Sequence, residues 1–275
     1  MQRLLGGQWL GSAFLMVVSL FMLAPISIVV VNSFNSVPYG AWPPPGLSTR
    51  WYSNLIQQQD FADAAIRSLE VAAVATIAAL LSGTLAALAL VRMRFPLKGP
   101  IHALLLSPMI VPKVSIGMAA FILFLRLHLY GSLPSLMVAH VALLLPFVVT
   151  IVSSGLVRID RRLEEAAQDL GAAPPIAFLK VALPQLRPSL VAAAVLSFIV
   201  SFDEVDASIF MVSQRGPTLP IAMFNYMQKY QDPTLAALST VLVGATLLLA
   251  LLMLRFFGTS GLTQMVGRTN QNPDP

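Results

Sequence analysis

The chain has no cysteine among its 275 residues. This absence excludes disulfide bonds, thiolate chemistry and metal sites built on cysteine. Charged side chains are also scarce: Asp, Glu, Lys and Arg form 11% of the residues, against about a quarter in soluble domains. Hydrophobic residues instead reach 57%, and the mean hydropathy is +0.79. A composition of this kind indicates a protein that folds in lipid.

The sequence also lacks the motifs of an enzyme. No segment matches the phosphate-binding pattern G-x-x-x-x-G-K-[ST], so we expect no ATP hydrolysis by this chain. The histidines His102, His128 and His140 lack metal-ligand spacing, and we expect them to be packing or interfacial residues. No nucleophile–base pair is evident. We therefore expect no catalytic residue, no metal site and no cofactor in this chain.

Six apolar runs are long enough to cross a membrane as helices of roughly 20 residues. Their approximate ranges are 10–32, 67–91, 101–125, 134–156, 188–212 and 235–257. The first run exceeds the roughly 7–15 residues of a signal-peptide core and no small-residue cleavage site follows it, so we interpret it as an uncleaved span. We predict an all-α membrane domain over residues 1–257 and a disordered polar tail over residues 258–275.

Lysine and arginine are distributed unevenly between the loops. With a cytoplasmic N-terminus, eleven of them fall in cytoplasmic segments and five in external ones. The cytoplasmic set is Arg3, Arg92, Arg94, Lys98, Arg158, Arg161, Arg162, Lys180, Arg187, Arg255 and Arg268, and the external set is Arg50, Arg67, Arg126, Arg215 and Lys229. The positive-inside rule then places both termini in the cytoplasm. It also accounts for the net charge of +5 without a nucleic-acid partner.

A polar segment at residues 158–187 interrupts the apolar pattern between the fourth and fifth runs. It contains Glu165-Ala166-Ala167, then three residues, Gly171, nine residues, and Val181-Ala182-Leu183-Pro184. The apolar residues Leu163, Ala166, Ala167 and Leu170 repeat at helical intervals, which predicts a short helix with an apolar stripe. By the orientation above, this segment lies in the cytoplasm.

The residues after that stripe predict a second helix. Gly171 suits the left-handed turn that ends a helix, and Pro174-Pro175 suit the first turn of the next one. We therefore predict two short helices at an angle, which form a protruding surface for contact with a soluble partner. An ordinary amphipathic cytoplasmic loop is the alternative.

The fifth apolar run carries three carboxylates, Asp203, Glu204 and Asp206. Counted from Pro188 at ~1.5 Å per residue, Asp203 lies ~22 Å into a hydrocarbon layer of ~30 Å. One charge at such depth costs about 3 kcal/mol on insertion scales, so three within four residues indicate a functional site. On a continuous helix Asp203 and Asp206 share a face, and Glu204 points roughly 100° away from Asp203.

We therefore expect Asp203 and Asp206 to face a substrate pathway and to attract an ammonium group, while Glu204 braces a neighbouring helix. Two alternatives remain. The carboxylates can form structural salt bridges with Arg126, Arg215 or Lys229, or they can simply be exposed where the helix breaks.

Lys113 is a cation inside the third apolar run, after Pro108 and Pro112. The two prolines predict a kinked helix with freed backbone carbonyls. A buried ammonium at this place can pair with one of the fifth-run carboxylates, or it can meet an anionic group on the substrate.

Taken together, these motifs resemble a known family over nearly the whole chain. The Glu165 to Pro184 pattern is the EAA loop of the membrane-spanning subunits of bacterial ABC importers, with Val181 where the family usually has Ile. Further stretches resemble the second permease subunit of spermidine/putrescine-type importers: VNSFNS at 31–36, WYSNL at 51–55, SP at 107–108, LPFVV at 145–149, EEAAQDLGA at 164–172, SFDEV at 201–205, TLPI at 218–221 and ALST at 237–240.

The resemblance implies a type I ABC importer permease fold, similar to that of methionine importers, with six spans and a cytoplasmic coupling helix in the bacterial inner membrane. It implies a second, homologous permease subunit, a dimer of ATPase subunits that carries ATP and Mg²⁺, and a periplasmic solute-binding protein. Contact with the ATPase is then expected from Glu165 above all, together with Glu164, Ala166, Ala167, Leu170, Gly171, Phe178, Leu183 and Pro184.

The expected function is alternating-access import of a small amine, either a polyamine or a related solute such as an aminobutyrate, aminophosphonate or opine. Lys113 departs from the acidic or neutral residue expected in the family, and favours an amine that also carries a carboxylate or phosphonate. A stand-alone ion-coupled transporter or channel is the alternative, although such a carrier needs no ATPase dock.

Overall fold

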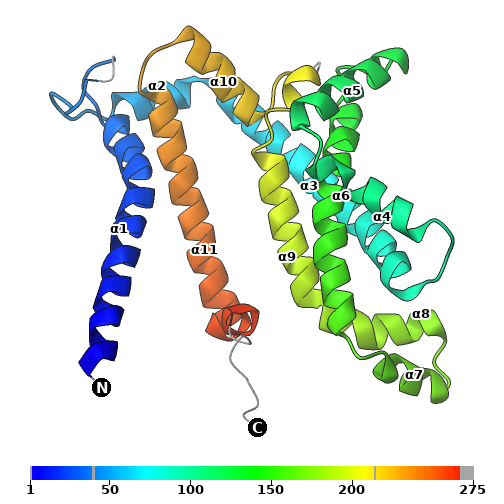
Figure 1. The fold of residues 1–275 in the computed structure, drawn as a ribbon. Helices are drawn as coiled ribbons and strands as arrows, with labels where there is room; N and C mark the ends of the chain where they lie inside the picture. Colours follow the sequence, from blue (N-terminus) through cyan, green and yellow to red (C-terminus); the bar gives the residue numbers. More distant parts are fainter. Residues whose placement is uncertain (1, 39–40, 214, 267–275) are drawn as a thin grey trace. The chain divides into compact units, whose positions relative to one another are not determined.

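The computed structural model describes residues 2–38, 41–213 and 215–266. Within these ranges the chain is built from helices, and its extended pairings are two isolated bridges, Asn35 with Leu47 and Ser213 with Gly216 (Figure 1). The helices form two compact units. Unit 1 comprises Met1–Gln59 and Tyr226–Pro275, and unit 2 comprises Asp60–Asn225.

Unit 1 joins the two ends of the chain. The long helix α1 (Gln2–Ser33) packs against α11 (Thr234–Val266), and the short helix α2 (Arg50–Gln57) also contacts α11. The Asn54 side-chain amide donates a 2.8 Å hydrogen bond to the Thr234 hydroxyl. The buried Trp51 indole donates to the carbonyl of Asn35 at 2.6 Å, which fixes α2 to the loop that precedes it.

Unit 2 is organised around three long helices, α3 (Gln59–Arg92), α6 (Leu133–Arg158) and α9 (Leu183–Phe202). Their shared core alternates small and large residues: Ala75, Ala79, Ala87, Leu144, Val148, Val152, Leu156, Ala182, Leu186 and Ala193. Small residues let helices approach closely, which is the main packing device in lipid. At Gly83 in α3, an added Cβ would lie 2.7 Å from a methyl group of Val148, so only glycine fits there.

The third apolar run is not one straight span. It forms α4 (Lys98–Leu106), a 3-10 turn η1 (Ser107–Met109) and α5 (Lys113–Arg126), and the two helices are bent by 104°. Pro108 lies in the turn and Pro112 directly precedes α5, so each falls where a proline removes a helical hydrogen bond. The predicted kink is therefore present, and it is large enough to make a broken span or a re-entrant loop.

The candidate spans agree in part with the six predicted. Four described helices are long and apolar enough to cross a membrane, at Gly11–Ser33, Gln59–Arg92, Leu133–Arg158 and Pro174–Phe202, and the bent pair makes up to five. The sixth predicted run lies in α11, of which Thr234–Leu248 qualifies as a shorter apolar helix. α11 itself continues to Val266, beyond the predicted start of a disordered tail at residue 258, and residues 267–275 lie outside the described residues.

Between α6 and α9 the chain forms α7 (Arg161–Asp169), α8 (Pro174–Ala177) and a π-helical turn η2 (Phe178–Ala182). α8, η2 and α9 follow one another without a gap, so the second predicted helix is the start of the fifth span rather than a separate short helix. After α9 come the 3-10 turn η3 (Ser208–Phe210) and α10 (Leu219–Lys229). α10 leads the chain from unit 2 into unit 1.

Candidate functional site

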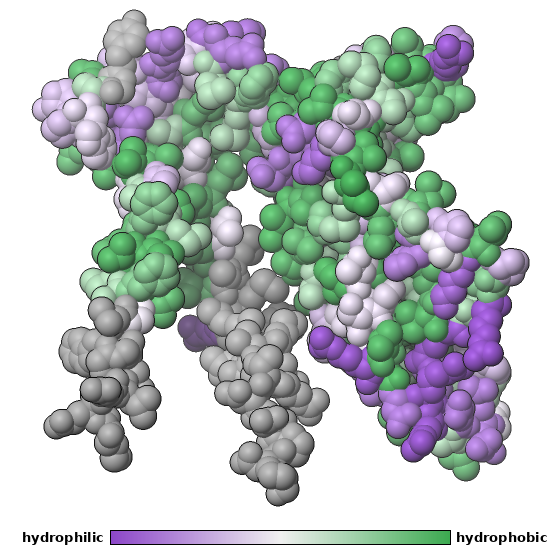
Figure 2. Space-filling view, viewed as in Figure 1, coloured by the Kyte–Doolittle hydropathy of each residue, from purple (hydrophilic) through white to green (hydrophobic). Residues whose placement is uncertain are grey.

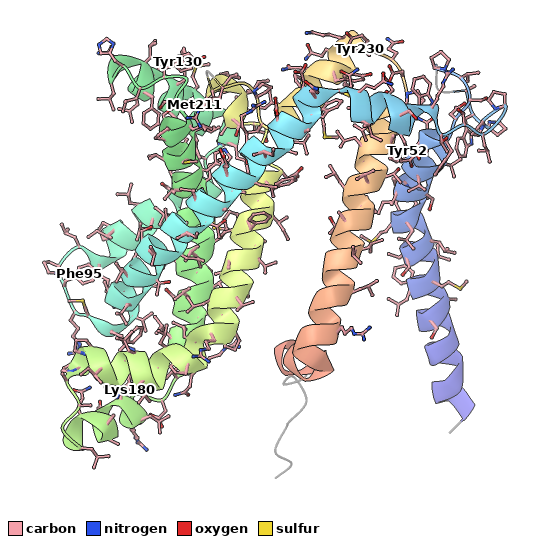
Figure 3. The ribbon with its side chains drawn as sticks, turned by 180° about the vertical axis from the view of Figure 1, so that it is seen from behind. Tyr52, Phe95, Tyr130, Lys180, Met211 and Tyr230 are labelled. Carbon is pink, nitrogen blue, oxygen red and sulfur yellow. The ribbon has the colours of Figure 1, made fainter. Side chains whose placement is uncertain are left out.

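Two polar regions lie at opposite ends of unit 2, and each contains residues that the sequence marks as functional. The first is the α7–α8 elbow, which joins α6 to α9. The second is the carboxylate segment at residues 203–206, which follows α9. In Figure 3, Lys180 marks the end with the elbow, and Tyr130 and Met211 mark the opposite end.

Short-range capping defines α7 at both ends. Asp160 is the N-cap, and its carboxylate accepts the Arg162 backbone N–H at 3.0 Å. At the other end Gly171 has a φ of +90°, which favours glycine. The Ala172 N–H reaches the Ala167 carbonyl at 3.0 Å, and the Gly171 N–H reaches the Gln168 carbonyl at 2.8 Å. This pair of bonds is the Schellman motif, so the predicted turn at Gly171 is confirmed.

The two neighbouring glutamates of α7 have different surroundings. Glu164 forms an ion pair with Arg92 at the last residue of α3, and both side chains are largely buried, with exposed fractions of 14% and 11%. Glu165 is exposed, and within the described residues neither Arg161 nor Arg162 forms an ion pair with it. Glu164 therefore ties α7 to α3, while the Glu165 carboxylate is available to another molecule.

The predicted apolar stripe of α7 faces outward. No residue of α7 is buried, Leu163 is exposed, and Leu170 directly after the helix is 90% exposed. In Figure 2 hydrophilic residues gather around this end of unit 2, so the exposed leucines lie in a polar setting. Apolar side chains held on a capped helix in such a setting are typical of a protein–protein contact surface.

The other predicted contact residues divide into two groups. Ala166, Gly171 and Pro184 are exposed, as a contact with a partner requires. Ala167, Phe178 and Leu183 are half-buried, and Phe178 packs against the core of α3, α6 and α9. The structure thus places Phe178 behind the outer surface, where it supports the elbow from inside unit 2.

At the opposite end, α9 stops earlier than the sequence suggests. Phe202 is its last residue, and Asp203 is its C-cap. The expectation that Asp203 and Asp206 share a face of a continuous helix is therefore wrong, because residues 203–207 are not helical. The alternative reading, that the helix breaks at the carboxylates, is the one that the structure supports. Asp203 and Asp206 are both exposed.

Glu204 has a different environment from its two neighbours. Its side chain is buried, and one carboxylate oxygen accepts the Lys113 ammonium at 2.7 Å. The other oxygen accepts the Ala207 backbone N–H at 3.0 Å. Lys113 is the first residue of α5, so the pair joins the α4–α5 break to the end of α9. Of the two alternatives for Lys113, the structure shows the pairing with a fifth-run carboxylate, although the lysine side chain is 42% exposed rather than buried. Within the described residues, Arg126, Arg215 and Lys229 form no ion pair with the three carboxylates.

A close backbone approach supports this junction. An added Cβ at Gly117 in α5 would lie 2.6 Å from both the Cα and the carbonyl oxygen of Ala207. Because the clashing atoms are backbone, no side chain can move aside. Glycine at residue 117 therefore allows α5 to lie against the segment that carries the carboxylates.

His140 forms hydrogen bonds on both sides of the carboxylate segment. This buried side chain projects from α6, and its Nδ1 lies 2.7 Å from the Ser201 hydroxyl and its Nε2 lies 2.7 Å from the Ser208 hydroxyl. The two serines flank residues 203–206, so the imidazole clamps the segment to α6. The prediction that His140 is a packing residue is confirmed, but its partners are separated from it by 61 and 68 residues and leave no local signal in the sequence.

The comparison with known proteins agrees with this architecture. Residues 75–260 match the family described as "Binding-protein-dependent transport system inner membrane component". The chain is 34% identical over 246 residues to the spermidine/putrescine transport system permease protein PotC of Escherichia coli (strain K12), covering 89% of this chain and 92% of that protein.

Two further relatives differ in the solute that their names give. The putrescine transport system permease protein PotI of Escherichia coli (strain K12) is 34% identical over 233 residues, covering 82% of each chain. The putative 2-aminoethylphosphonate transport system permease protein PhnV of Salmonella paratyphi A (strain ATCC 9150 / SARB42) is 32% identical over 231 residues, covering 83% of this chain and 86% of the relative.

Solved structures share the fold. A bacterial ABC transporter involved in the import of the acidic polysaccharide alginate aligns with a TM-score of 0.70 at 16% identity, over 93% of this chain and 97% of that one. The MetNI methionine ABC transporter in an inward-facing conformation aligns with a TM-score of 0.54 at 18% identity, over 81% of this chain and all of that one. The predicted fold class, an all-α permease fold of ABC importers, is confirmed.

Proposed function

The chain belongs to the family of binding-protein-dependent transport system inner membrane components, and we propose that it carries a polyamine or a closely related small amine through the inner membrane. As a member of this family it is a transport permease and not an enzyme. In the proposed assembly it pairs with a second permease subunit above two ATPase subunits, and a periplasmic solute-binding protein delivers the amine. ATP and Mg²⁺ are assigned to the ATPase, because this sequence has no phosphate-binding loop.

The observation that carries the proposal is the difference in surroundings between Glu164, which is paired, and Glu165, which is exposed. Glu164 is fixed to Arg92, whereas Glu165 and the leucines beside it face outward on a capped helix. A partner that binds this surface acts on a helix already tied to α3. We propose that this partner is the ATPase and that Glu165 makes the main polar contact with it.

Two connections can transmit a movement of the elbow to the membrane-spanning helices. One runs through the Arg92–Glu164 pair into α3. The other runs through α8 and η2 into α9, which packs closely on α6. The turn η2, which directly precedes α9, is π-helical. Single π-helical turns within helices occur frequently at functional sites. ATP binding would close the ATPase dimer and open the pathway outward, and hydrolysis would restore the inward-facing state.

For the substrate pathway we propose Asp203 and Asp206. Both carboxylates are exposed beyond the end of α9, and both belong to the carboxylate segment, which is held by His140 and by the Lys113–Glu204 pair. Exposed acidic groups on a rigid segment attract ammonium groups without a large cost of ordering. Weak attraction is sufficient, because the binding protein is expected to supply most of the affinity.

The position of Lys113 bears on the class of amine. Its ammonium is engaged by Glu204, so it is not a free cation for a carboxylate or phosphonate on the substrate. The lysine in the third run therefore no longer argues against a polyamine. Of the solutes named for the relatives, putrescine and spermidine suit two exposed carboxylates better than 2-aminoethylphosphonate does.

The proposal is tested with the complete importer in proteoliposomes. Uptake of labelled putrescine, spermidine, 4-aminobutyrate and 2-aminoethylphosphonate is measured with the intact ATPase and with its catalytic glutamate replaced by glutamine. We expect ATP-dependent uptake of the diamine or triamine, and none with the glutamine variant. Uptake that persists in the variant and follows a proton or sodium gradient would establish the ion-coupled alternative instead.

A further inference from the structure

A cavity with a mainly apolar wall and a few polar groups lies outside the elbow and the carboxylate segment. It has a volume of about 460 Å³, and it is lined by Leu90, Val91, Lys98, Gly99, His102 and Ser153. These residues come from the end of α3, from α4 and from α6, all within unit 2. None of the six is acidic, and two of them carry basic side chains. The cavity therefore has the charge of an anion site.

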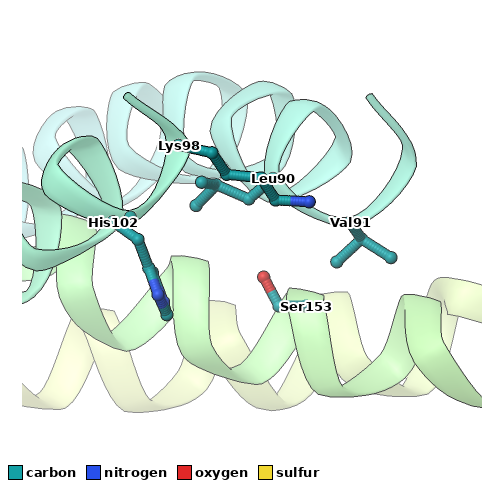
Figure 4. Close-up of a pocket in the computed structure, with 6 residues that line it drawn as sticks. Leu90, Val91, Lys98, His102 and Ser153 are labelled. Carbon is teal, nitrogen blue, oxygen red and sulfur yellow. The ribbon is translucent and has the colours of Figure 1, made fainter. Parts of the chain in front are cut away.

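The polar groups that line the cavity come from α4 and α6. In Figure 4, His102 reaches from α4 toward α6, and the Ser153 hydroxyl points back toward Leu90 and Lys98. The Ser153 hydroxyl is buried and has no hydrogen-bond partner among the described residues. Lys98 uses one donor on the Met93 carbonyl at 3.3 Å, which leaves two of the three ammonium protons. Lysine, histidine and serine thus place several hydrogen-bond donors around the cavity.

The cavity lies close to the ends of two helices that are long and apolar enough to cross a membrane. Leu90 lies two residues from the end of α3, and Ser153 lies five residues from the end of α6. At 1.5 Å per residue these positions are about 3 Å and about 8 Å from the polar ends of the helices. The headgroup layer on each side of the hydrocarbon core is itself about 5–8 Å thick. With the ends of α3 and α6 placed at the membrane surface, the cavity would lie at the level of the lipid phosphates.

We infer that this cavity binds the phosphate of an anionic glycerophospholipid, such as phosphatidylglycerol. Lys98 supplies the charge, His102 and Ser153 donate hydrogen bonds to the phosphate oxygens, and Leu90 and Val91 pack against the start of the acyl chains. Basic pockets between membrane helices recognise anionic headgroups in this way. The site is next to the Arg92–Glu164 pair in sequence, so a bound lipid would stabilise the end of α3 that holds the elbow.

Native mass spectrometry of the complete importer, released from detergent and titrated with lipid, tests this inference. We expect phosphatidylglycerol to be retained by the wild type and about fivefold more weakly by Lys98→Gln, since one lysine near the headgroups contributes a factor of this size. Ser153→Ala provides a second variant without a change of charge, and should weaken retention in the same direction. Arg94→Gln is the matched control, because Arg94 is exposed in the same loop and does not line the cavity.

The other outcomes have definite meanings. Equal loss in Lys98→Gln and Arg94→Gln would overturn the site, since it would show attraction by the general charge of the loop. Equal retention of phosphatidylcholine and phosphatidylglycerol would overturn the choice of an anionic headgroup. Displacement of the lipid by millimolar inorganic phosphate would assign the cavity to a free anion rather than to a membrane lipid.

Discussion

The elbow and the carboxylate segment, at opposite ends of unit 2, use neighbouring acidic residues in the same way. In the elbow, Glu164 is paired with Arg92 from α3, and Glu165 is exposed. In the carboxylate segment, Glu204 is paired with Lys113 from α5, and Asp203 and Asp206 are exposed. In each region one carboxylate joins two helices, while its neighbours remain available to another molecule.

In both regions, carboxylates that are neighbours in the sequence have different roles. Adjacent carboxylates in a helical or turn segment point in different directions, so one can be held by the protein while the next faces outward. The paired residue makes the segment rigid, and the exposed residue then meets its ligand or partner from a fixed position. We expect substitution of the exposed carboxylates to reduce transport, and substitution of the paired residues to reduce stability.

The largest effect is expected from Glu165→Lys. The substitution places a positive charge at the proposed ATPase contact, and losing one partner of a charged interface contact costs about 2–5 kcal/mol. ATP-dependent uptake should therefore fall by at least about thirtyfold, while the amount of inserted protein is unchanged. Uptake in proteoliposomes and co-purification of the ATPase measure the two parts of this prediction.

Glu70→Lys serves as its control, because Glu70 is an exposed glutamate of α3 and receives the same change of charge. Uptake by this variant should stay within about twofold of the wild type. Normal uptake by Glu165→Lys, or an equal loss in both variants, would contradict the assigned role of Glu165.

The next largest effect is expected when an anchoring cation is removed. Lys113→Met leaves the buried Glu204 carboxylate without its partner, and breaking a fully buried pair costs about 3–5 kcal/mol. Because the Lys113 side chain is 42% exposed, we expect a smaller loss of about 1–3 kcal/mol. The thermal unfolding midpoint of the purified complex should fall accordingly.

A double-mutant cycle identifies the cause of that loss. Glu204→Gln combined with Lys113→Met should be more stable than the sum of the two single effects predicts, since the second change removes the unpaired charge. In the elbow, the double variant Arg92→Met, Glu164→Gln should likewise be more stable than the sum of its two single effects predicts. Additive effects in either cycle would show that the pair does not anchor its segment.

A moderate effect on transport is expected from the double variant Asp203→Asn, Asp206→Asn. It removes two negative charges from the proposed pathway but leaves the Lys113–Glu204 pair intact. Uptake of putrescine should fall about tenfold, which corresponds to about 1.4 kcal/mol, while capture by the binding protein is unaffected. Asp60→Asn with Asp63→Asn is the matched control, since these two exposed aspartates of α3 are also three residues apart.

Unchanged uptake in the Asp203, Asp206 variant would remove these residues from the pathway. A loss of equal size in the control variant would instead indicate a general effect of surface charge on the arrival of a cationic solute.

The smallest effect is expected from Ser208→Ala, which releases one side of the His140 clamp. A single hydrogen bond contributes about 1 kcal/mol, so the unfolding midpoint should fall slightly and uptake should change less than twofold. Ser154→Ala should have almost no effect, because its hydroxyl bonds the Thr150 carbonyl of its own helix at an exposed site. Equal effects of the two serine substitutions would contradict the clamp.

Local rules explain which features were predictable from the sequence. Gly171 and Pro174 determine where one helix ends and the next begins, and both act through their own backbone, so these two boundaries were predicted correctly. The prediction of a second, separate short helix was wrong, because α8 continues through η2 into α9. The break between α4 and α5 was also marked by prolines, although its 104° angle depends on packing that no local rule describes.

The missed features depend on contacts between distant residues. α9 ends at Phe202 without a glycine or proline to mark it, and the turn is held instead by the Glu204 carboxylate and the Ala207 N–H. Arg92 and Glu164 are 72 residues apart, and their pairing was not predicted. The pairing of Lys113 with a fifth-run carboxylate was one of two alternatives, but the choice of Glu204, 91 residues away, was not predicted. Such pairs exist only because the helices of unit 2 pack together, so the sequence indicates the charges but does not determine which residues pair.

The central claim is that an ATPase subunit binds the elbow, and site-directed cross-linking tests it most directly. The chain has no cysteine, so Leu170→Cys introduces a single thiol at a side chain that is 90% exposed. We predict a cross-link from this thiol to the ATPase in the assembled importer, and none from Ile110→Cys, an equally accessible residue at the α4–α5 break. A functional importer in which the thiol at residue 170 never links to the ATPase would contradict the account.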